Sequence, residues 1–237
     1  WRFRENVVNE VGFASDIGNA REVNEDSLLI IEVNSTYQSR LAGRTLLMIA
    51  DGMGGNAGGE VASHLACESM GRGITEKLLS RDVTDFRDTL KQLIADANKE
   101  ILRYATDHKE CQGMATTVVA AVVDSDQLYV AHVGDSRAYI VNSKDIIRVT
   151  KDHSIVQELV DKKMITPMNA ATHPQRNVVT KVVGYFGEVD PDLSALGLEK
   201  GDYILLCSDG LTNKVRDEEI QQIILKIKDS RASCQAL

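Results

Sequence analysis

The chain has 237 residues, of which 43% are hydrophobic and 26% are charged, and its formal net charge is -8. These proportions are those of an ordinary globular protein with enough chain for a sizeable core in one domain or two. The negative charge argues against nucleic acid or an anionic membrane surface as the main partner. No apolar run approaches the roughly 18–20 residues that are needed to span a bilayer.

The hydrophobic pattern predicts strands in runs and helices in separate groups. Short apolar runs bounded by turn residues predict strands over 11–13, 28–33, 45–50, 117–123, 128–133, 137–141, 146–149 and 203–207. Apolar positions at helical spacing predict helices over 61–79, 86–106, 155–160 and 220–227. Pro167 and Pro174 mark an irregular polar stretch. This arrangement indicates an α+β layered fold rather than alternating βαβ units.

The residues that usually bind zinc are not grouped in this sequence. The four cysteines are widely scattered and form no C-x-x-C pair: Cys67, Cys111, Cys207 and Cys234. A zinc site is therefore not expected, and a reducing compartment, the cytoplasm, is the better prediction. His64 and His132 fall within the helix and strand patterns and are predicted to be packing or surface residues rather than ligands.

Acidic residues stand at the ends of apolar runs, or in turns, at four places. These are Asp51-Gly52, Gly134-Asp135-Ser136, Ser208-Asp209-Gly210 and Asn24-Glu25-Asp26. Carboxylates that are gathered in one place repel each other, and the usual remedy is a hard divalent cation. Taken together, the four places predict a metal site.

Each of these pieces also has a plainer interpretation. A single Asp-Gly pair is most often just a turn, and the acidic residues at 24–26 could form a solvated strand entry. The glycines between 52 and 59 are typical either of a flexible loop or of a close approach of the backbone to a ligand. The order of the pieces along the chain carries more information than any one of them.

Seven short segments occur in an order that resembles a known family. They are 15–26, 50–55, 113–117, 133–137, 151–154, 173–180 and 208–211. The series resembles the type 2C metal-dependent serine/threonine protein phosphatases, in their bacterial branch. The resemblance covers nearly the whole chain, from about residue 11 to about residue 227.

The resemblance implies a fold and a domain organisation. The family has two antiparallel β-sheets in a central sandwich flanked by helical pairs, with metals at one end between the sheets. Residues 1–237 would then form a single catalytic domain. The segment of about 151–180 matches a variable flap beside the active site, and it is called the flap below.

The resemblance also implies roles for individual residues. Asp51 matches a carboxylate that bridges two metal ions, and Gly52 matches a glycine whose carbonyl binds one of them. Asp209 matches a ligand of the other ion, and Asp135 matches a residue that holds a third ion together with Asp209. Arg21 matches the arginine that binds the substrate phosphate. Two further acidic positions lie beside the metals, bound directly or through water: Glu25 and Asp26.

The implied activity is metal-dependent hydrolysis of phosphoserine and phosphothreonine on proteins. Two Mn²⁺ or Mg²⁺ ions, with a third in bacterial members, would activate the attacking water, with Asp51 and Asp209 as the central catalytic ligands. The expected partners are phosphorylated proteins, including a serine/threonine kinase, with no nucleic acid and no membrane contact from this segment. The chain is expected to act as a monomer.

The sequence departs from the family pattern in two respects. Met53 and Asn56 occupy positions at which relatives carry histidine, so no general acid can be named. The chain ends at Leu237, before the family's last Asp-Asn motif, and it opens at Trp1 without a methionine. We expect a fragment that has been cut short, the other interpretation being a protein without that metal ligand and its final strand.

The sequence allows two other classes of function besides the phosphatase. A regulatory pseudophosphatase would bind a phosphoprotein without turnover, and the missing terminal aspartate would fit it. A protein without turnover would have no reason to keep the four charged residues of the site together, and this chain retains all of them: Arg21, Asp51, Asp135 and Asp209. A calcium-binding structural domain fits poorly, because no D-x-[DN]-x-[DN]-G loop is present.

Overall fold

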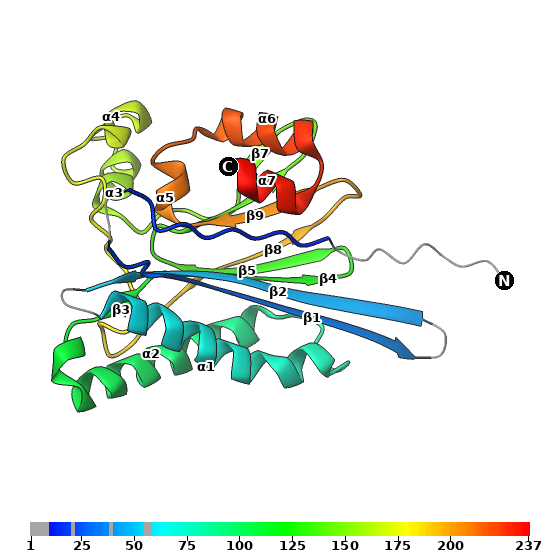
Figure 1. Cartoon of the computed structure of the whole chain (residues 1–237), viewed down its shortest axis with the longest axis horizontal. Coiled ribbons are helices and arrows are strands. Elements are labelled where there is room, and N and C mark those ends of the chain that lie inside the picture. The colour runs from blue at the N-terminus through cyan, green and yellow to red at the C-terminus, as the bar shows by residue number, and fades with distance from the viewer. Residues whose placement is uncertain (1–9, 20–21, 38–39, 55–57) are drawn as a thin grey trace.

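Two β-sheets form the centre of the molecule, and the neighbouring strands in both are antiparallel (Figure 1). The structure, a computed structural model, describes residues 10–19, 22–37, 40–54 and 58–237. The larger sheet has the order β1-β2-β4-β5-β8, with β3 on β2: β1 (Asp26–Tyr37), β2 (Arg40–Met53), β3 (Ala115–Thr116), β4 (Val118–Asp124), β5 (Gln127–Val133) and β8 (Asp192–Gly197). The smaller sheet has the order β7-β6-β9: β7 (Ile146–Arg148), β6 (Arg137–Val141) and β9 (Tyr203–Cys207).

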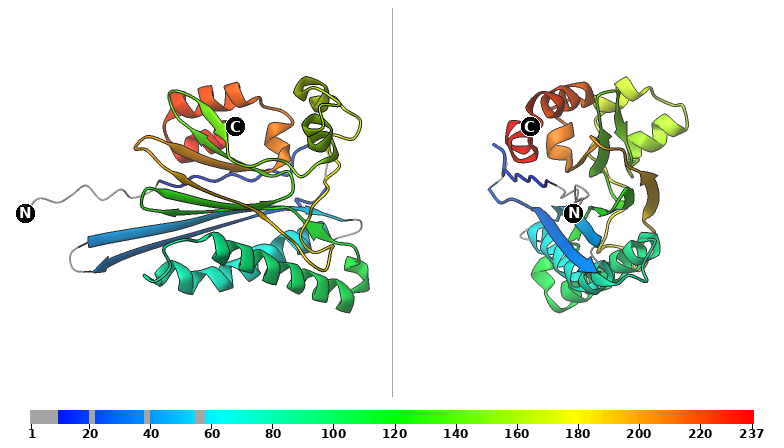
Figure 2. Two further views of the ribbon diagram at one scale, coloured as in Figure 1. Left: turned by 180° about the vertical axis from the view of Figure 1, so that it is seen from behind. Right: turned by 90° about the vertical axis from the view of Figure 1, so that its right-hand side faces the viewer.

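Helices cover the outer faces of both sheets (Figures 1 and 2). The larger sheet carries α1 (Gly59–Leu79) and α2 (Arg87–Asp107), followed by the short 3₁₀ helix η1 (Lys109–Cys111). The smaller sheet carries α6 (Asp217–Ile227) and α7 (Ser230–Ala236). The predicted α+β fold of two antiparallel sheets between helical pairs is therefore confirmed.

The central strands are apolar on both faces, because each face is covered by another layer. In β4, Val118 and Ala120 pack in the cluster that the larger sheet forms with α1 and α2. Their neighbours Val119 and Ala121 pack in a second cluster between the two sheets. A strand buried on both faces gives a continuous apolar run instead of alternating polar and apolar residues. This explains why β4 was easily predicted from the sequence.

Several local features differ from the sequence prediction. The strand expected at 11–13 is wrong: this segment forms no strand and instead packs against α7, where Ser230 donates hydrogen bonds to Glu10. β8 was not predicted, because it is a half-exposed edge strand. The stretch expected to be irregular contains the short helix α4 (Pro167–Ala171), which begins where the Thr166 hydroxyl accepts from the amide of Asn169.

The flap crosses one end of the molecule, where Figure 1 shows α3 (Ile155–Asp161) and α4 beside α5 (Asp209–Thr212). Its start is bound to the central strands, because the amide of His153 donates to the carbonyl of Gly134 at 2.8 Å. The segment that follows the flap pairs with β3 through two hydrogen bonds between Thr116 and Val183. Within the described part of the chain, no helix combines the length and apolar character that crossing a membrane requires.

Candidate active site

Four of the acidic residues singled out in the sequence lie at the flap end of the two sheets. Asp26 opens β1 and stands directly opposite Asp51, near the end of β2. Asp135 lies in the turn between β5 and β6, where the chain passes from the larger sheet to the smaller one. Asp209 follows β9 and begins α5. Both sheets therefore contribute carboxylates to one end of the sandwich.

The electrostatics of these carboxylates confirm that they are close neighbours. Burial, followed by the negative charge of Asp26, raises the pKa of Asp51 to about 8. Asp209 and Asp135 raise the same pKa further. Burial and the charge of Asp209 raise the pKa of Asp135 to about 7. Each negative charge here makes the next one harder to form, and a bound cation would relieve that repulsion.

The backbone of Asp51 is held rigidly by the segment around β3. Its amide donates to the Thr117 hydroxyl at 3.0 Å, and its carbonyl accepts from the Thr117 amide and the Thr116 hydroxyl, both at 2.9 Å. The Thr117 hydroxyl also contacts the Ser136 hydroxyl at 2.7 Å, and both residues are buried. Both residues fall in segments that resemble family motifs, 113–117 and 133–137, but the sequence predicts no role for Thr117 or Ser136. Neither residue has a local signal in the sequence: Ser136 stands between Asp135 and Arg137, and the contact joins positions 19 apart.

Glycine is required at position 52 because two backbone segments meet there. The Gly52 amide donates to the carbonyl of Glu25 at 3.0 Å. A Cβ at position 52 would lie 2.0 Å from the carbonyl oxygen of Gly59. A Cβ on Gly59 would in turn lie 2.6 Å from a carboxylate oxygen of Glu25, which places that acidic side chain beside the Asp51–Gly52 turn. At Gly52 and Gly59 the observed role is thus close packing of backbone.

Two polar side chains orient site carboxylates. The Ser208 hydroxyl donates to Asp26 at 2.7 Å, which joins the end of β9 to the start of β1. The side-chain amide of Asn213 donates to Asp209 at 3.0 Å from the following turn of chain. Two site positions of the sequence analysis, Arg21 and Asn56, lie outside the described residues. Neither the phosphate-binding role of Arg21 nor the surroundings of Asn56 are described by the structure.

A second polar cluster lies between β5, β8 and the flap. Ligand atoms of His132, His153 and Asp192 all fall within 4.8 Å of one another, closer than those of the four aspartates, among the residues that the structure describes. The ligand atoms around a single metal ion must lie this close to one another. A carboxylate that bridges two ions roughly 3.5–4 Å apart spreads its neighbours over a wider space.

The hydrogen bonds of the histidine cluster argue against a metal there. Nε2 of His132 contacts the carbonyl of Lys151 at 2.8 Å, so this nitrogen carries the proton. Nδ1 of His153 accepts from the Gly134 amide at 3.1 Å, which leaves its proton on Nε2, 3.2 Å from Asp192. Only one of the two rings then offers a lone pair. We interpret the stacked rings, 4.5 Å apart, as a structural link between the sheet and the flap.

The buried histidine predicts a pH dependence of stability. Burial, followed by the charge of His153, lowers the pKa of His132 to about 4. In the unfolded chain the ring titrates near about 6.5, so the unfolded state binds more protons between these values. Stability should fall as the pH drops through this window, by roughly 3 kcal/mol for the whole shift. His132→Gln retains a donor for the Lys151 carbonyl but has no such proton to bind.

Urea unfolding of both proteins in EDTA, from pH 7 to pH 4.5, measures this effect. The variant should gain stability relative to the wild type as the pH falls, because all other titrating groups are shared. His64→Gln, at an exposed position, is the matched control for replacing a histidine by glutamine. A constant difference for His132→Gln would assign the acid sensitivity to other groups.

The chain matches the family model described as Protein phosphatase 2C over residues 21–233. It is 36% identical over 216 residues to the Protein phosphatase PhpP of Streptococcus pneumoniae, covering 91% of this chain and 84% of that protein. Among solved structures, the serine/threonine phosphatase Stp1 from Staphylococcus aureus superimposes with a TM-score of 0.81 and 38% identity, covering 98% of this chain and 92% of that one.

A further solved structure is the catalytic domain of the serine threonine protein phosphatase PstP in complex with two manganese ions. It has a TM-score of 0.78 and 32% identity, and covers 94% of this chain and 86% of that one. The family predicted from the seven sequence segments is therefore confirmed, with bacterial relatives, and with it the prediction of a phosphatase enzyme. The chain belongs to the protein phosphatase 2C family.

Proposed function

We propose that this protein hydrolyses phosphoserine and phosphothreonine on proteins, using Mn²⁺ or Mg²⁺. The observation that carries the proposal is the gathering of four aspartates at one end of the sandwich, where Asp26 stands opposite Asp51. Burial, and then the charges of these neighbours, raise the pKa of Asp51 to about 8. Carboxylate and carbonyl oxygens suit hard divalent ions much better than zinc. The manganese ions in the related PstP structure support the same choice of cofactor.

The proposed ligands are the residues named from the sequence. Asp51 would bridge two ions, with the Gly52 carbonyl and Asp209 completing their protein ligands, and Asp135 would join Asp209 at a third ion. Glu25 and Asp26 would bind directly or through water, and Arg21 would bind the substrate phosphate. The rigid hydrogen bonding of the Asp51 backbone supports this scheme, because a bridging ligand must hold its position.

When bound, such ions lower the pKa of a water molecule and so supply hydroxide near neutral pH. The chain's own groups favour direct attack by water over a covalent intermediate. Burial raises the pKa of the Cys67 and Cys207 thiols to about 12, so neither offers a thiolate at neutral pH. Met53 next to the site cannot donate a proton. Protonation of the leaving group must therefore come from water or another residue.

The sequence also suggests where and with what the enzyme works. We propose phosphorylated proteins as substrates, among them a serine/threonine kinase, and a monomer acting in the cytoplasm. All four cysteines are free thiols in the structure, which supports a reducing compartment.

Hydrolysis of p-nitrophenyl phosphate and of a phosphothreonine peptide, with Mn²⁺ and then with EDTA, tests the proposed function. Both substrates should be hydrolysed with Mn²⁺ only. Asp209→Asn should lose activity, whereas Asp192→Asn, in the histidine cluster, should keep it. Equal rates with Mn²⁺ and EDTA would contradict the mechanism. Binding of the phosphopeptide without turnover would instead favour the pseudophosphatase.

A further inference from the structure

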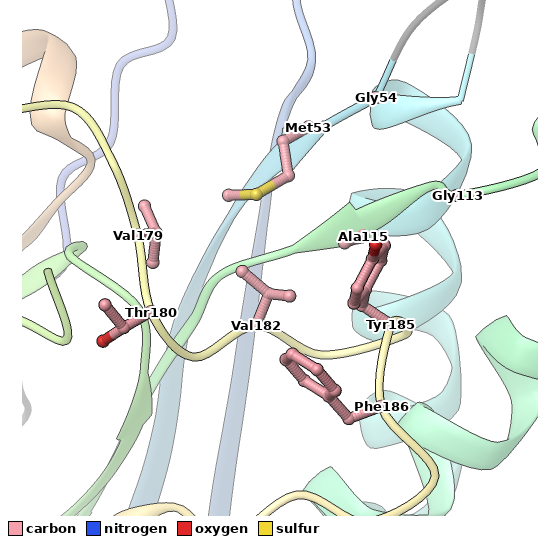
Figure 3. A pocket seen from close by; sticks show the side chains of 9 residues that line it. All are labelled: Met53, Gly54, Gly113, Ala115, Val179, Thr180, Val182, Tyr185 and Phe186. Atoms are coloured by element: carbon pink, nitrogen blue, oxygen red, sulfur yellow. The ribbon is translucent and has the colours of Figure 1, made fainter. Parts of the chain in front are cut away.

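An apolar cavity of about 250 Å³, shown in Figure 3, has Met53 in its lining, two residues along the chain from Asp51 of the proposed metal site. Its lining comes from three parts of the chain: the end of β2, the residues from Gly113 to Ala115, and the residues from Val179 to Phe186, where the flap ends and the chain leaves it. In Figure 3 the side chains of Met53, Val179 and Val182 gather round one space. No charged side chain lines it among the described residues. A charged group of carboxylates and an uncharged apolar surface thus lie next to each other.

The cavity is built on the same piece of sheet as Asp51. Met53 stands two residues beyond Asp51 on β2, about 7 Å along the strand, and pairs with Ala115 on β3. The hydroxyl of Thr116, the next residue of β3, donates to the Asp51 carbonyl, and the Thr116 backbone makes two hydrogen bonds with the backbone of Val183. The flap side of the cavity therefore has a fixed position relative to the proposed metal site.

Two exposed aromatic residues stand at the edge of the cavity. Tyr185 is 59% exposed and Phe186 is 51% exposed, and their rings meet edge to face at 5.0 Å. The loop that carries them is fixed from below by Asn98 of α2, which is 1% exposed. Asn98 accepts from the Gly184 amide at 2.7 Å and donates to the Phe186 carbonyl at 2.9 Å.

Glycine is needed at position 184 in this loop. Its φ is +94°, and a Cβ there would lie 2.3 Å from Ile101. The loop is thus held by a buried amide and close packing while its two aromatic rings face solvent. A fixed apolar surface in water is typical of a binding site.

We propose that this cavity binds an apolar side chain of the protein substrate, close in sequence to the phosphorylated residue. The proposal rests on the proposed phosphatase function and adds a substrate preference to it. Pockets for drug-sized ligands measure about 300–1,000 Å³, so this smaller cavity suits one side chain. The strand from Asp51 to Met53 runs directly from the reaction site into the cavity, and an extended substrate would span the same distance.

The uncharged lining selects apolar residues over acidic ones. A well-fitting apolar side chain should raise kcat/KM by roughly tenfold to a hundredfold over a small one. The experiment uses phosphothreonine peptides that differ only in carrying leucine, alanine or aspartate at each position flanking the phosphothreonine. p-Nitrophenyl phosphate, which has no flanking residue, serves as the reference substrate for the hydrolysis step itself.

The wild type should prefer leucine over alanine and aspartate at one flanking position at least. In Phe186→Ala and Tyr185→Ala the leucine peptide should lose about tenfold in kcat/KM, while p-nitrophenyl phosphate is hydrolysed as before. Both side chains are exposed, so these variants should fold. Met168→Ala removes an apolar side chain of the flap that is 82% exposed and outside the cavity, and it should change neither rate.

The outcomes separate the two proposals. Equal rates for the leucine, alanine and aspartate peptides, with p-nitrophenyl phosphate still hydrolysed in Mn²⁺, would overturn the cavity proposal alone. Failure to hydrolyse any substrate would contradict the phosphatase function. In that case the fluorescence anisotropy of the labelled peptides measures binding directly. Tighter binding of the leucine peptide, lost in Phe186→Ala, would support the cavity, and equal binding would overturn it.

Discussion

Asp51→Asn should abolish both the phosphatase activity and most of the stabilisation by Mn²⁺. The rate should fall by about a thousandfold, which corresponds to about 4 kcal/mol of lost transition-state stabilisation. Metal that binds only the native wild type stabilises it by about 2.7 kcal/mol at a hundredfold excess over Kd. Without the bridging carboxylate most of this gain should disappear, as measured by thermal melts with and without Mn²⁺.

The metal-free proteins should show the opposite order of stability. The native pKa of Asp51, about 8, lies above the value in the unfolded chain, so the native state binds more protons over the intervening range. The stability that protonated Asp51 contributes to the metal-free wild type is therefore lost as the pH rises through about 8. Asp51→Asn lacks this loss and should melt higher than the wild type in EDTA at pH 8.

Asp161→Asn, which replaces an exposed carboxylate of the flap, is the control. If Mn²⁺ raises the melting temperatures of wild type and Asp51→Asn equally, Asp51 is not the bridging ligand.

Gly52→Ala should be strongly destabilising even though it adds a single methyl group. The new Cβ would meet the backbone of Gly59 at 2.0 Å and the carbonyl of Glu25 at 2.6 Å, and no flexible side chain can move away. Overpacking of this kind costs about 3 kcal/mol, which corresponds to a fall of roughly 6–12 °C in Tm for a chain of this size. Activity should fall with it, because Glu25 and Asp51 would be displaced.

Gly187→Ala is the matched control for this substitution. A Cβ at position 187 would meet nothing within 4 Å. Thermal melts should therefore place Gly187→Ala close to the wild type and Gly52→Ala well below it. Similar melting temperatures for the two variants would show that the turn after Asp51 can open at little cost. The flexible-loop interpretation of these glycines would then be correct.

Residues with a strong local signal were predicted well from the sequence. β4 and β5 are buried on both faces, so their apolar runs have no other good explanation. Asp51 near the end of β2 and Asp209 just after β9 both follow apolar runs and precede glycine, so their positions near strand ends were predicted. These features depend on neighbouring residues along the chain.

Features that depend on contacts between distant segments were not predictable in this way. Thr117 and Ser136 share a hydrogen bond across 19 positions of sequence, and neither has a local pattern that reveals it. β8 lies at the edge of the sheet, where half-exposed residues give no clear alternation. The apolar cavity brings together three segments whose residues individually look like turn or strand positions.

The most direct test of the proposed metal site is the anomalous scattering of Mn²⁺ in crystals of this protein. Two peaks about 3.5–4 Å apart should flank the Asp51 carboxylate, with oxygen ligands at about 2.0–2.6 Å. Asp209 and the Gly52 carbonyl should lie within that distance of one ion or the other. A peak at His132, His153 and Asp192, with none at Asp51, would contradict the assignment and place the metal at the histidine cluster.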